Sequence, residues 1–236
     1  AALDAWAWTA CGWLSRAEPI GQQMLNTLYT CLIQDARLGM HAAHALRVLT
    51  LHSRLVSPSR GFVVRRLYRQ RTMETMLVAV TEALEGRCAA REPCLVAMAT
   101  LLPGATDAFV SMHLPTWLPL LVHTLGMDDA PVRLTCARTL QRIVSRDHAV
   151  ALLEHLPLLV PRLLEAAATP QAPRLRVAAL QALQALTDAV PAAHLNAYRR
   201  QVVQALGRPH RGVDDALRAV RTAAVDCRAA WYATQE

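Results

Sequence analysis

The chain has 236 residues, of which 53% are hydrophobic and 5% aromatic, and its 25 basic residues are all arginine, giving a net charge of +7. It contains no apolar run of about 18 to 20 residues, so neither a membrane span nor a membrane partner is expected. The charge suits an acidic protein or nucleic acid, but we attribute most of it to a genome biased towards arginine codons. Six cysteines occur without a C-x-x-C pair, which indicates reduced, mostly buried thiols rather than a disulfide framework or a zinc site: Cys11, Cys31, Cys88, Cys94, Cys136 and Cys227.

The N-terminal half predicts helices in pairs. Residues 3–14 form one helix without a first partner, which suggests a half-repeat and a chain cut from a longer array. The apolar spacing then predicts a pair at 21–33 and 38–51, a break at 57–61, a short helix at 62–71, and a second pair at 73–84 and 93–102. The short helix carries the densest basic cluster of the chain, for which a solvated or partner-facing role is favoured over phosphate binding: Arg65, Arg66, Arg69 and Arg71.

The C-terminal half repeats itself. A Leu-Pro helix opening at Leu114 recurs at Leu156, and the same step along the chain lands on Tyr198. Each opening is followed by a second apolar-periodic segment, so the predicted pairs are 114–125 with 131–144, 152–166 with 174–187, and 198–206 with 217–231. A helix pair recurring at about 42 residues is typical of HEAT repeats, and such a pair must stack on its neighbours to bury its apolar face.

The sequence therefore predicts an all-α fold, a HEAT-type α-solenoid in which antiparallel helix pairs form a right-handed superhelix. We expect a single domain over residues 1–236, with about five helix pairs and the N-terminal half-repeat. In HEAT arrays an aspartate in the turn between helices often pairs with an arginine early in the second helix, and we assign Arg133 and Arg176 to such a ladder. Second helices line the concave side of the array, and we expect partner binding there and on the short basic helix: Arg138, Arg142, Gln181, Gln184, Arg218, Arg221, Arg228, Arg69 and Arg71.

Motifs of catalysis are missing from the sequence. It has no Walker loop, no G-x-S-x-G, no H-E-x-x-H and no supported carboxylate pair. His41 and His44 lie on one helical face and could contact one metal ion, but no third ligand stands in an obvious position. We therefore expect no catalytic, cofactor-binding or metal-binding residues, and no enzyme.

Several segments resemble the C-terminal HEAT repeats of the MMS-nineteen family, named for methyl methanesulfonate sensitivity. The most specific are residues 176–187 (RVAALQALQALT), 198–206 (YRRQVVQAL) and 218–231 (RAVRTAAVDCRAAW). Residues 68–71 (YRQR) and 5–9 (AWAWT) add to the similarity, which covers essentially the whole chain, while residues 86–93 depart from it.

This resemblance implies a non-catalytic adapter of the cytosolic iron–sulfur protein assembly targeting complex, present in cytoplasm and nucleus. Its implied partners are a MIP18-type subunit, through it a WD40-type subunit, and apo iron–sulfur proteins such as repair helicases and polymerases that receive [4Fe–4S] clusters. Two alternatives stay open: a generic HEAT scaffold of the nuclear-transport or phosphatase type, and a HEAT-type nucleic-acid-binding module. Direct nucleic-acid binding is the less expected of these, because the basic composition has the codon explanation given above.

Overall fold

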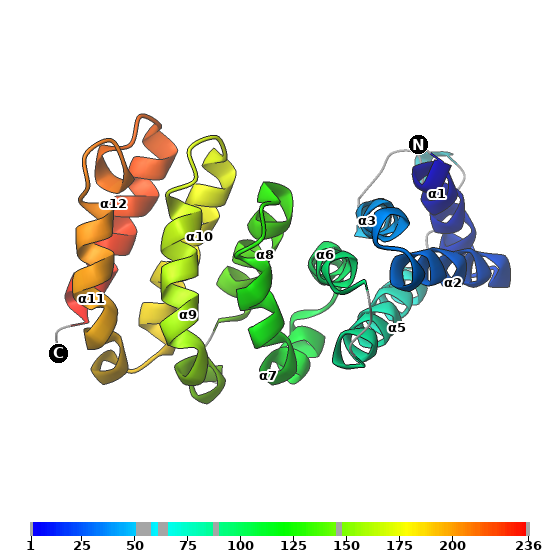
Figure 1. Ribbon diagram of the computed structural model, residues 1–236, viewed down its shortest axis with the longest axis horizontal. Helices are drawn as coiled ribbons and strands as arrows, with labels where there is room; N and C mark the ends of the chain where they lie inside the picture. Colours follow the sequence, from blue (N-terminus) through cyan, green and yellow to red (C-terminus); the bar gives the residue numbers. More distant parts are fainter. Residues whose placement is uncertain (1, 51–57, 61–65, 87–89, 145–147, 235–236) are drawn as a thin grey trace. The chain divides into compact units, whose positions relative to one another are not determined.

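The computed structural model describes residues 2–50, 58–60, 66–86, 90–144 and 148–234. Throughout these residues the regular structure is helical, with no strand, which confirms the all-α prediction (Figure 1). The chain divides into two compact units, Ala1–Phe109 and Val110–Glu236. The expected single domain over residues 1–236 therefore stays a prediction, as does the HEAT type of the helix pairs.

The first unit is built around α6, whose residues from Pro93 to Ala99 are all buried. This helix packs against α2, α3, α4 and α5, and α1 packs on α2. The lack of a side chain at Gly21 permits the contact between α1 and α2, because a Cβ there would lie 2.8 Å from the backbone nitrogen of Leu14. The helices of this unit are α1 (Ala2–Ser15), α2 (Pro19–Gln34), α3 (Ala36–Ala45), α4 (Arg47–Thr50), α5 (Arg66–Glu85) and α6 (Arg91–Leu101).

The second unit contains the sequence repeat as successive helix pairs. The helices that come second in each pair, α8, α10 and α12, pack side by side with α10 in the middle, and α9 lies beside α11 (Figure 1). Each of α10 and α12 also packs on the first helix of its own pair. These helices are α7 (Asp107–Thr124), α8 (Ala130–Ile143), α9 (Ala149–Ala167), α10 (Pro173–Ala189), α11 (Ala192–Leu206) and α12 (Arg218–Ala233).

Local sequence explains where the second helices begin. Asp129 precedes α8 and its carboxylate accepts the N–H of Val132 at 3.0 Å, which satisfies one of the donors that a helix start leaves unpaired. Pro131 and Pro173 stand in the first turns of α8 and α10, where a missing N–H removes no helical hydrogen bond. The two prolines occupy equivalent positions of the repeat, which accounts for the similar starts of α8 and α10.

The predicted starts of the first helices were wrong. Leu114, Leu156 and Tyr198 lie inside α7, α9 and α11, which begin at Asp107, Ala149 and Ala192. The recurring Leu-Pro pair was interpreted as a helix opening, yet α7 and α9 each run through two prolines. The prolines lie on the outer side of helices whose other side carries a continuous row of buried apolar residues, so tertiary packing outweighs the cost of proline within the helix.

Two further boundaries in the first unit differ from prediction. The short helix at 62–71 and the helix at 73–84 are one continuous helix, α5, over its described part from Arg66. The helix predicted at 38–51 is interrupted at Leu46, between α3 and α4. Residues 51–57, 61–65 and 87–89, which include Arg65 and Cys88, lie outside the described residues.

Candidate functional site

A groove crosses the second helices of the second unit. We call it the second-helix groove; its volume is about 220 Å³. It extends over α8, α10 and the start of α12, three helices that occupy equivalent places in successive repeats. Its lining consists of Arg138, Pro173, Arg174, Val177, Ala178, Gln181, Leu217, Ala219 and Val220.

The chemistry of the groove combines an apolar floor with polar edges. Val220 and Ala178 are buried at its base, whereas Leu217 is 45% exposed and open to a partner. Arg138 and Gln181 are exposed beside them. Apolar surface with arginine at its border is typical of protein-docking sites, where burial supplies affinity and charge supplies selectivity.

The structure brings part of the predicted site together. Arg138 and Gln181 both line the second-helix groove. Arg142 is exposed one turn after Arg138 on α8, and Arg218 is exposed at the first residue of α12, next to the lining residue Leu217. Gln184 lies one turn beyond Gln181 and is half-buried. These positions form the part of the predicted surface that a partner can reach.

Other predicted arginines are engaged within the chain. Arg221 donates from Nη1 to the carbonyl oxygens of Asp215 at 2.7 Å and Ala216 at 3.0 Å. The carboxylate of Asp215 is only 3% exposed, pairs with the guanidinium of Arg176, and accepts the N–H of Leu217 at 2.9 Å. The predicted ladder role of Arg176 is confirmed, with the carboxylate coming from the turn before α12, in the next repeat along the chain. That of Arg133 stays a prediction.

Arg69 and Arg71 belong to the first unit. Arg69 donates to the carbonyl oxygens of Leu49 and, at 3.4 Å, of Val48, so its guanidinium binds the C-terminal end of α4. Helix C-termini carry unpaired carbonyls and a partial negative charge, which an arginine stabilises. Arg71 is exposed on α5. Arg69 thus makes a structural contact, whereas the docking role of Arg71 stays a prediction.

The buried thiols have little nucleophilic or ligand character. Burial raises the pKa of Cys136 and of Cys227 to about 12, so both stay protonated at neutral pH. Burial also raises the pKa of Cys11, although the nearby charge of Arg69 opposes the shift. Among the described residues no group of three or more His, Cys, Asp or Glu side chains is placed to hold a metal ion, and no described helix is long and apolar enough to cross a membrane.

Sequence reasoning missed part of the groove lining. Arg174, Val177 and Ala178 were not singled out. Arg174 lies one turn before Val177 and Ala178, which lie one turn before Gln181 on the same side of α10. Their helical spacing was visible in the sequence. The contribution of Leu217 was not visible, since the predicted helix at 217–231 includes this residue, whereas it lies at the residue before α12, in extended conformation.

Known proteins resemble this chain over most of its length. A family model for the MMS19 C-terminal region, described as RNAPII transcription regulator C-terminal, matches residues 1–187. The human MMS19 nucleotide excision repair protein homolog is 29% identical over 232 residues, which cover 96% of this chain and 22% of that protein. The DNA repair/transcription protein mms19 of Schizosaccharomyces pombe is 26% identical over 238 residues, covering 98% of this chain and 22% of that protein. The chain thus spans about a fifth of the length of these relatives.

A crystal structure of an engineered protein from the Northeast Structural Genomics Consortium has a similar fold. Its TM-score is 0.55 at 13% sequence identity, with 97% of each chain covered. At this identity the likeness concerns the fold alone. The family match extends from the first unit into α10 of the second and includes the helices that form most of the groove. The chain belongs to the MMS19 C-terminal family.

Proposed function

We propose that this chain is a protein-docking scaffold that acts in DNA repair and transcription within the nucleus. The relatives are named for nucleotide excision repair, DNA repair and transcription, and none of those names describes a catalytic activity. The observation that carries the docking role is the second-helix groove, an open surface with an apolar floor bordered by arginine. A groove of this kind suits a protein segment better than a small substrate, because it is shallow and has no converging catalytic groups.

More specifically, we propose an adapter role in the cytosolic iron–sulfur protein assembly targeting complex, in cytoplasm as well as nucleus. In this role the chain docks a MIP18-type subunit and through it a WD40-type subunit. The complex then delivers [4Fe–4S] clusters to apo-proteins such as repair helicases and polymerases. The cluster is cargo, and the protonated state of Cys136 and Cys227 supports a role in positioning proteins rather than in holding the cluster.

The apolar side chains of the groove and the arginines beside it would contribute to docking in different ways. Leu217 and Val177 offer apolar surface whose removal from water favours association. Arg138 and Arg218 lie exposed beside that surface, and their charges select a partner segment with carboxylates and speed its encounter. Arg176 and Asp215 support the site from below by tying α10 to the turn before α12.

Calorimetric titration of the chain with the MIP18-type subunit tests this proposal. The double variant Arg138→Glu/Arg218→Glu should weaken binding about 100-fold, since each reversal replaces an attraction by a repulsion. Arg208→Glu changes another exposed arginine away from the groove lining and should leave affinity within about twofold. Circular dichroism should show equal helicity for all variants.

Each other outcome has a definite meaning. Unchanged affinity of the double variant would show that the partner docks on a different face. Failure of the wild-type chain to bind at micromolar concentration would contradict the targeting-complex role and favour the generic scaffold. Retention of DNA that weakens steeply with salt would favour the nucleic-acid-binding alternative.

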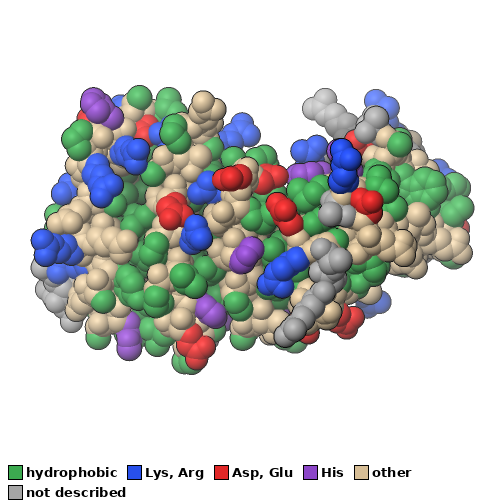
Figure 2. Space-filling view, in the orientation of Figure 1, with side chains coloured by type: hydrophobic (Ala, Val, Ile, Leu, Met, Phe, Trp, Pro, Cys, Tyr) green, Lys and Arg blue, Asp and Glu red, His purple; other side chains and the backbone are tan. Residues whose placement is uncertain are grey.

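Figure 2 shows the arginines scattered among apolar and polar side chains on the visible face, an arrangement that suits protein docking better than a continuous phosphate track.

A further inference from the structure

A hollow lies beside the first helices of the last two repeats, where α9 and α11 end next to each other (Figure 1). We call it the first-helix hollow; its volume is about 340 Å³, near the lower limit of ligand-binding pockets. It is lined by the last turns of α9 and α11 and by the loop that follows α11. None of the residues that line it also lines the second-helix groove, so the two surfaces can be changed independently.

Two arginines of the loop after α11 line the first-helix hollow. Arg208 and Arg211 are exposed, and neither guanidinium forms a hydrogen bond or an ion pair within the described residues. The N–H of Arg211 donates to the carbonyl oxygen of Arg208 at 3.2 Å, and Gly212, with φ of +54°, brings the loop against Leu206. Because the loop backbone is held in this way, both charges stand at the hollow before a ligand arrives.

The net charge of the hollow is positive. Glu165, the acidic residue in its lining, forms an ion pair with Arg162 at 2.9 Å. The C-terminal ends of α9 and α11 each carry about half an elementary negative charge. Together they offset about one of the two guanidinium charges, so Arg208 and Arg211 still attract an anion.

Two glutamine amides stand in the same hollow. Gln201 and Gln204 lie one turn apart on α11 and are exposed, and neither side chain forms a hydrogen bond within the described residues. A primary amide can donate to a carbonyl oxygen and accept an N–H at the same time. Two such amides in line suit the backbone of an extended peptide, which presents both groups at every residue.

The rest of the lining is largely apolar. Leu164 and Ala168, at the end of α9, are half-buried, and so is Ala205 on α11. A ligand that covers these side chains removes apolar surface from water, which favours binding. The hollow therefore combines positive charge, backbone-binding amides and apolar surface.

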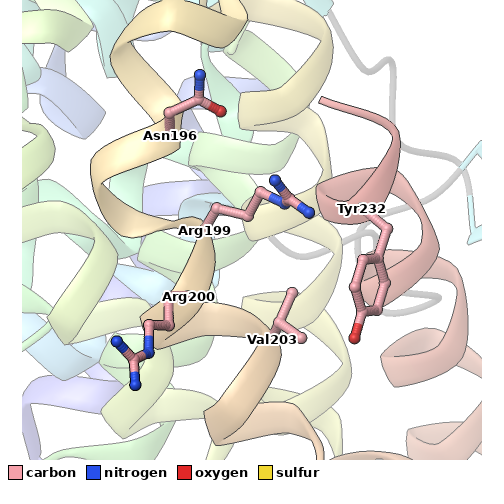
Figure 3. A pocket seen from close by; sticks show the side chains of 5 residues that line it. All are labelled: Asn196, Arg199, Arg200, Val203 and Tyr232. Atoms are coloured by element: carbon pink, nitrogen blue, oxygen red, sulfur yellow. The ribbon is translucent and has the colours of Figure 1, made fainter. Parts of the chain in front are cut away.

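The larger hollow beside Tyr232, of about 520 Å³, does not offer free charge in the same way (Figure 3). The guanidinium carbon of Arg199 lies 5.9 Å from the centroid of the Tyr232 ring, within the range of cation–π attraction. Arg200 points outward from that hollow. The first-helix hollow is therefore the better candidate for an anionic ligand.

We propose that the first-helix hollow binds a short, extended, acidic segment of a partner protein. A glutamate or aspartate of the segment pairs with Arg208 and Arg211 through charged hydrogen bonds. The amides of Gln201 and Gln204 hold its backbone, and an apolar residue beside the carboxylate covers Leu164. This site goes beyond the docking role proposed for the second-helix groove and does not depend on the partner bound there.

A peptide fits the hollow better than nucleic acid does. Single-stranded nucleic acid binds largely by stacking its bases on aromatic rings. The lining of the first-helix hollow contains no aromatic side chain. Its two free arginines also come from one short loop, which suits a single acidic group better than a row of phosphates.

Fluorescence anisotropy with the whole chain tests this proposal. The probe is a fluorescein-labelled peptide with a leucine centre and glutamates on both sides, and the control probe carries glutamine in place of glutamate. The glutamate probe should bind saturably and should weaken as salt rises, because the arginines are exposed. Arg211→Gln should weaken it about tenfold, the effect of losing one charged hydrogen-bonding partner, and Gln204→Ala about threefold, the effect of losing a neutral one.

Matched variants separate this site from general positive charge and from the second-helix groove. Arg200→Gln removes the same charge from an exposed position of α11 outside the first-helix hollow, and Arg138→Gln removes it from the groove. Each should leave binding within about twofold. Arg208→Gln provides a second test within the hollow if Arg211→Gln lowers helicity.

Three results would overturn the proposal. The first is equal affinity for the glutamate and glutamine probes. The second is weakening by Arg200→Gln or Arg138→Gln that equals the effect of Arg211→Gln, which would assign the probe to general charge or to the groove. The third is tighter binding of labelled oligothymidine than of the glutamate probe, which would assign the hollow to nucleic acid.

Discussion

In Val110–Glu236 the helices recur at a regular interval and their second members stack in one row, whereas in Ala1–Phe109 helices of very different length surround one buried helix. Arginines do not follow this contrast, because each unit has both engaged and exposed ones. Arg69 binds the end of α4 and Arg221 binds the turn before α12, whereas Arg71 in the first unit and Arg138 in the second are exposed. A regular stack presents equivalent faces repeatedly, so positions on the second helices can form a continuous docking surface. An irregular core offers no such repetition.

The comparison also shows how the regular unit is stabilised. Its last pair is attached by buried groups: Trp231 donates from its indole nitrogen to the carbonyl of Leu183 on α10 at 3.0 Å, and Asp215 pairs with Arg176. In the first unit Trp6 and Trp13 are 41% and 37% exposed. Buried polar contacts therefore add to apolar packing in holding α12 and the turn before it against α10, and substitutions at Trp231 and Asp215 test how much they contribute.

The largest effect is expected at Trp231. Trp231→Ala removes a fully buried ring and leaves the carbonyl of Leu183 without its donor, so the free energy of unfolding should fall by about 4 kcal/mol. Urea denaturation followed by circular dichroism measures this. Trp13→Ala in the first unit, where the side chain is 37% exposed, should cost much less. Equal losses would show that α12 is no more firmly attached than the exposed side of α1.

The next largest loss of stability is expected at Asp215, because its carboxylate joins two repeats. Asp215→Asn leaves the guanidinium of Arg176, only 13% exposed, without a carboxylate and should lower the free energy of unfolding by about 3 kcal/mol. Glu165→Gln removes the exposed pair with Arg162, which is 2.9 Å long, and should cost no more than about 0.5 kcal/mol. Both variants are measured by urea denaturation at one salt concentration. Similar small losses would contradict a structural role for the buried pair.

Two glycines should respond in opposite directions. Gly212 has φ of +54°, and a Cβ there would lie 2.2 Å from the carbonyl oxygen of Leu206, so Gly212→Ala should destabilise the second unit by about 2 kcal/mol. Gly12 in α1 has open space around its Cβ position, so Gly12→Ala should stabilise its helix by about 0.5 to 1 kcal/mol. Thermal unfolding with the two variants in parallel would show the signs, and a loss at Gly12 would contradict the described surroundings of α1.

The buried thiols should make the stability of the second unit depend on pH, but only in alkaline solution. Burial raises the pKa of Cys136 and Cys227 to about 12 in the folded chain, so the folded state holds more protons than the unfolded state above the ordinary thiol pKa near 9. The free energy of unfolding should therefore fall between about pH 9 and 12, by about 1.4 kcal/mol per pH unit for each thiol. Below pH 9 these thiols should have no effect on stability.

Urea titrations at pH 8 and pH 10 measure this fall, and the double variant Cys136→Ala/Cys227→Ala supplies the reference. The difference between the two chains isolates the thiols from tyrosine ionisation. Iodoacetamide should modify the half-buried Cys31 before either buried thiol. A pH dependence that is the same in both chains would show that these thiols are accessible to water in the folded state.

The candidate site was predictable where it depends on helical period. Arg138 and Gln181 were placed on second helices from the sequence, and both line the second-helix groove. The interior contacts were not predictable in the same way. Arg221 has the same residue type and helical face as exposed arginines, but it donates hydrogen bonds to the backbone carbonyl oxygens of Asp215 and Ala216. Tyr232 was not among the predicted site residues, and the approach of Arg199 to its ring joins two helices that the linear pattern treats separately.

The sequence by itself determined the helical class, the repeat of the second unit and the buried faces, because helix formation and apolar periodicity are local properties that a linear pattern records. Tertiary structure decided where α7, α9 and α11 begin, since packing of their buried faces carries α7 and α9 through proline. It also decided which arginines are available, because that depends on carboxylates and carbonyls brought close by folding. The sequence gives the number and positions of the arginines, whereas the fold determines which groups each of them contacts.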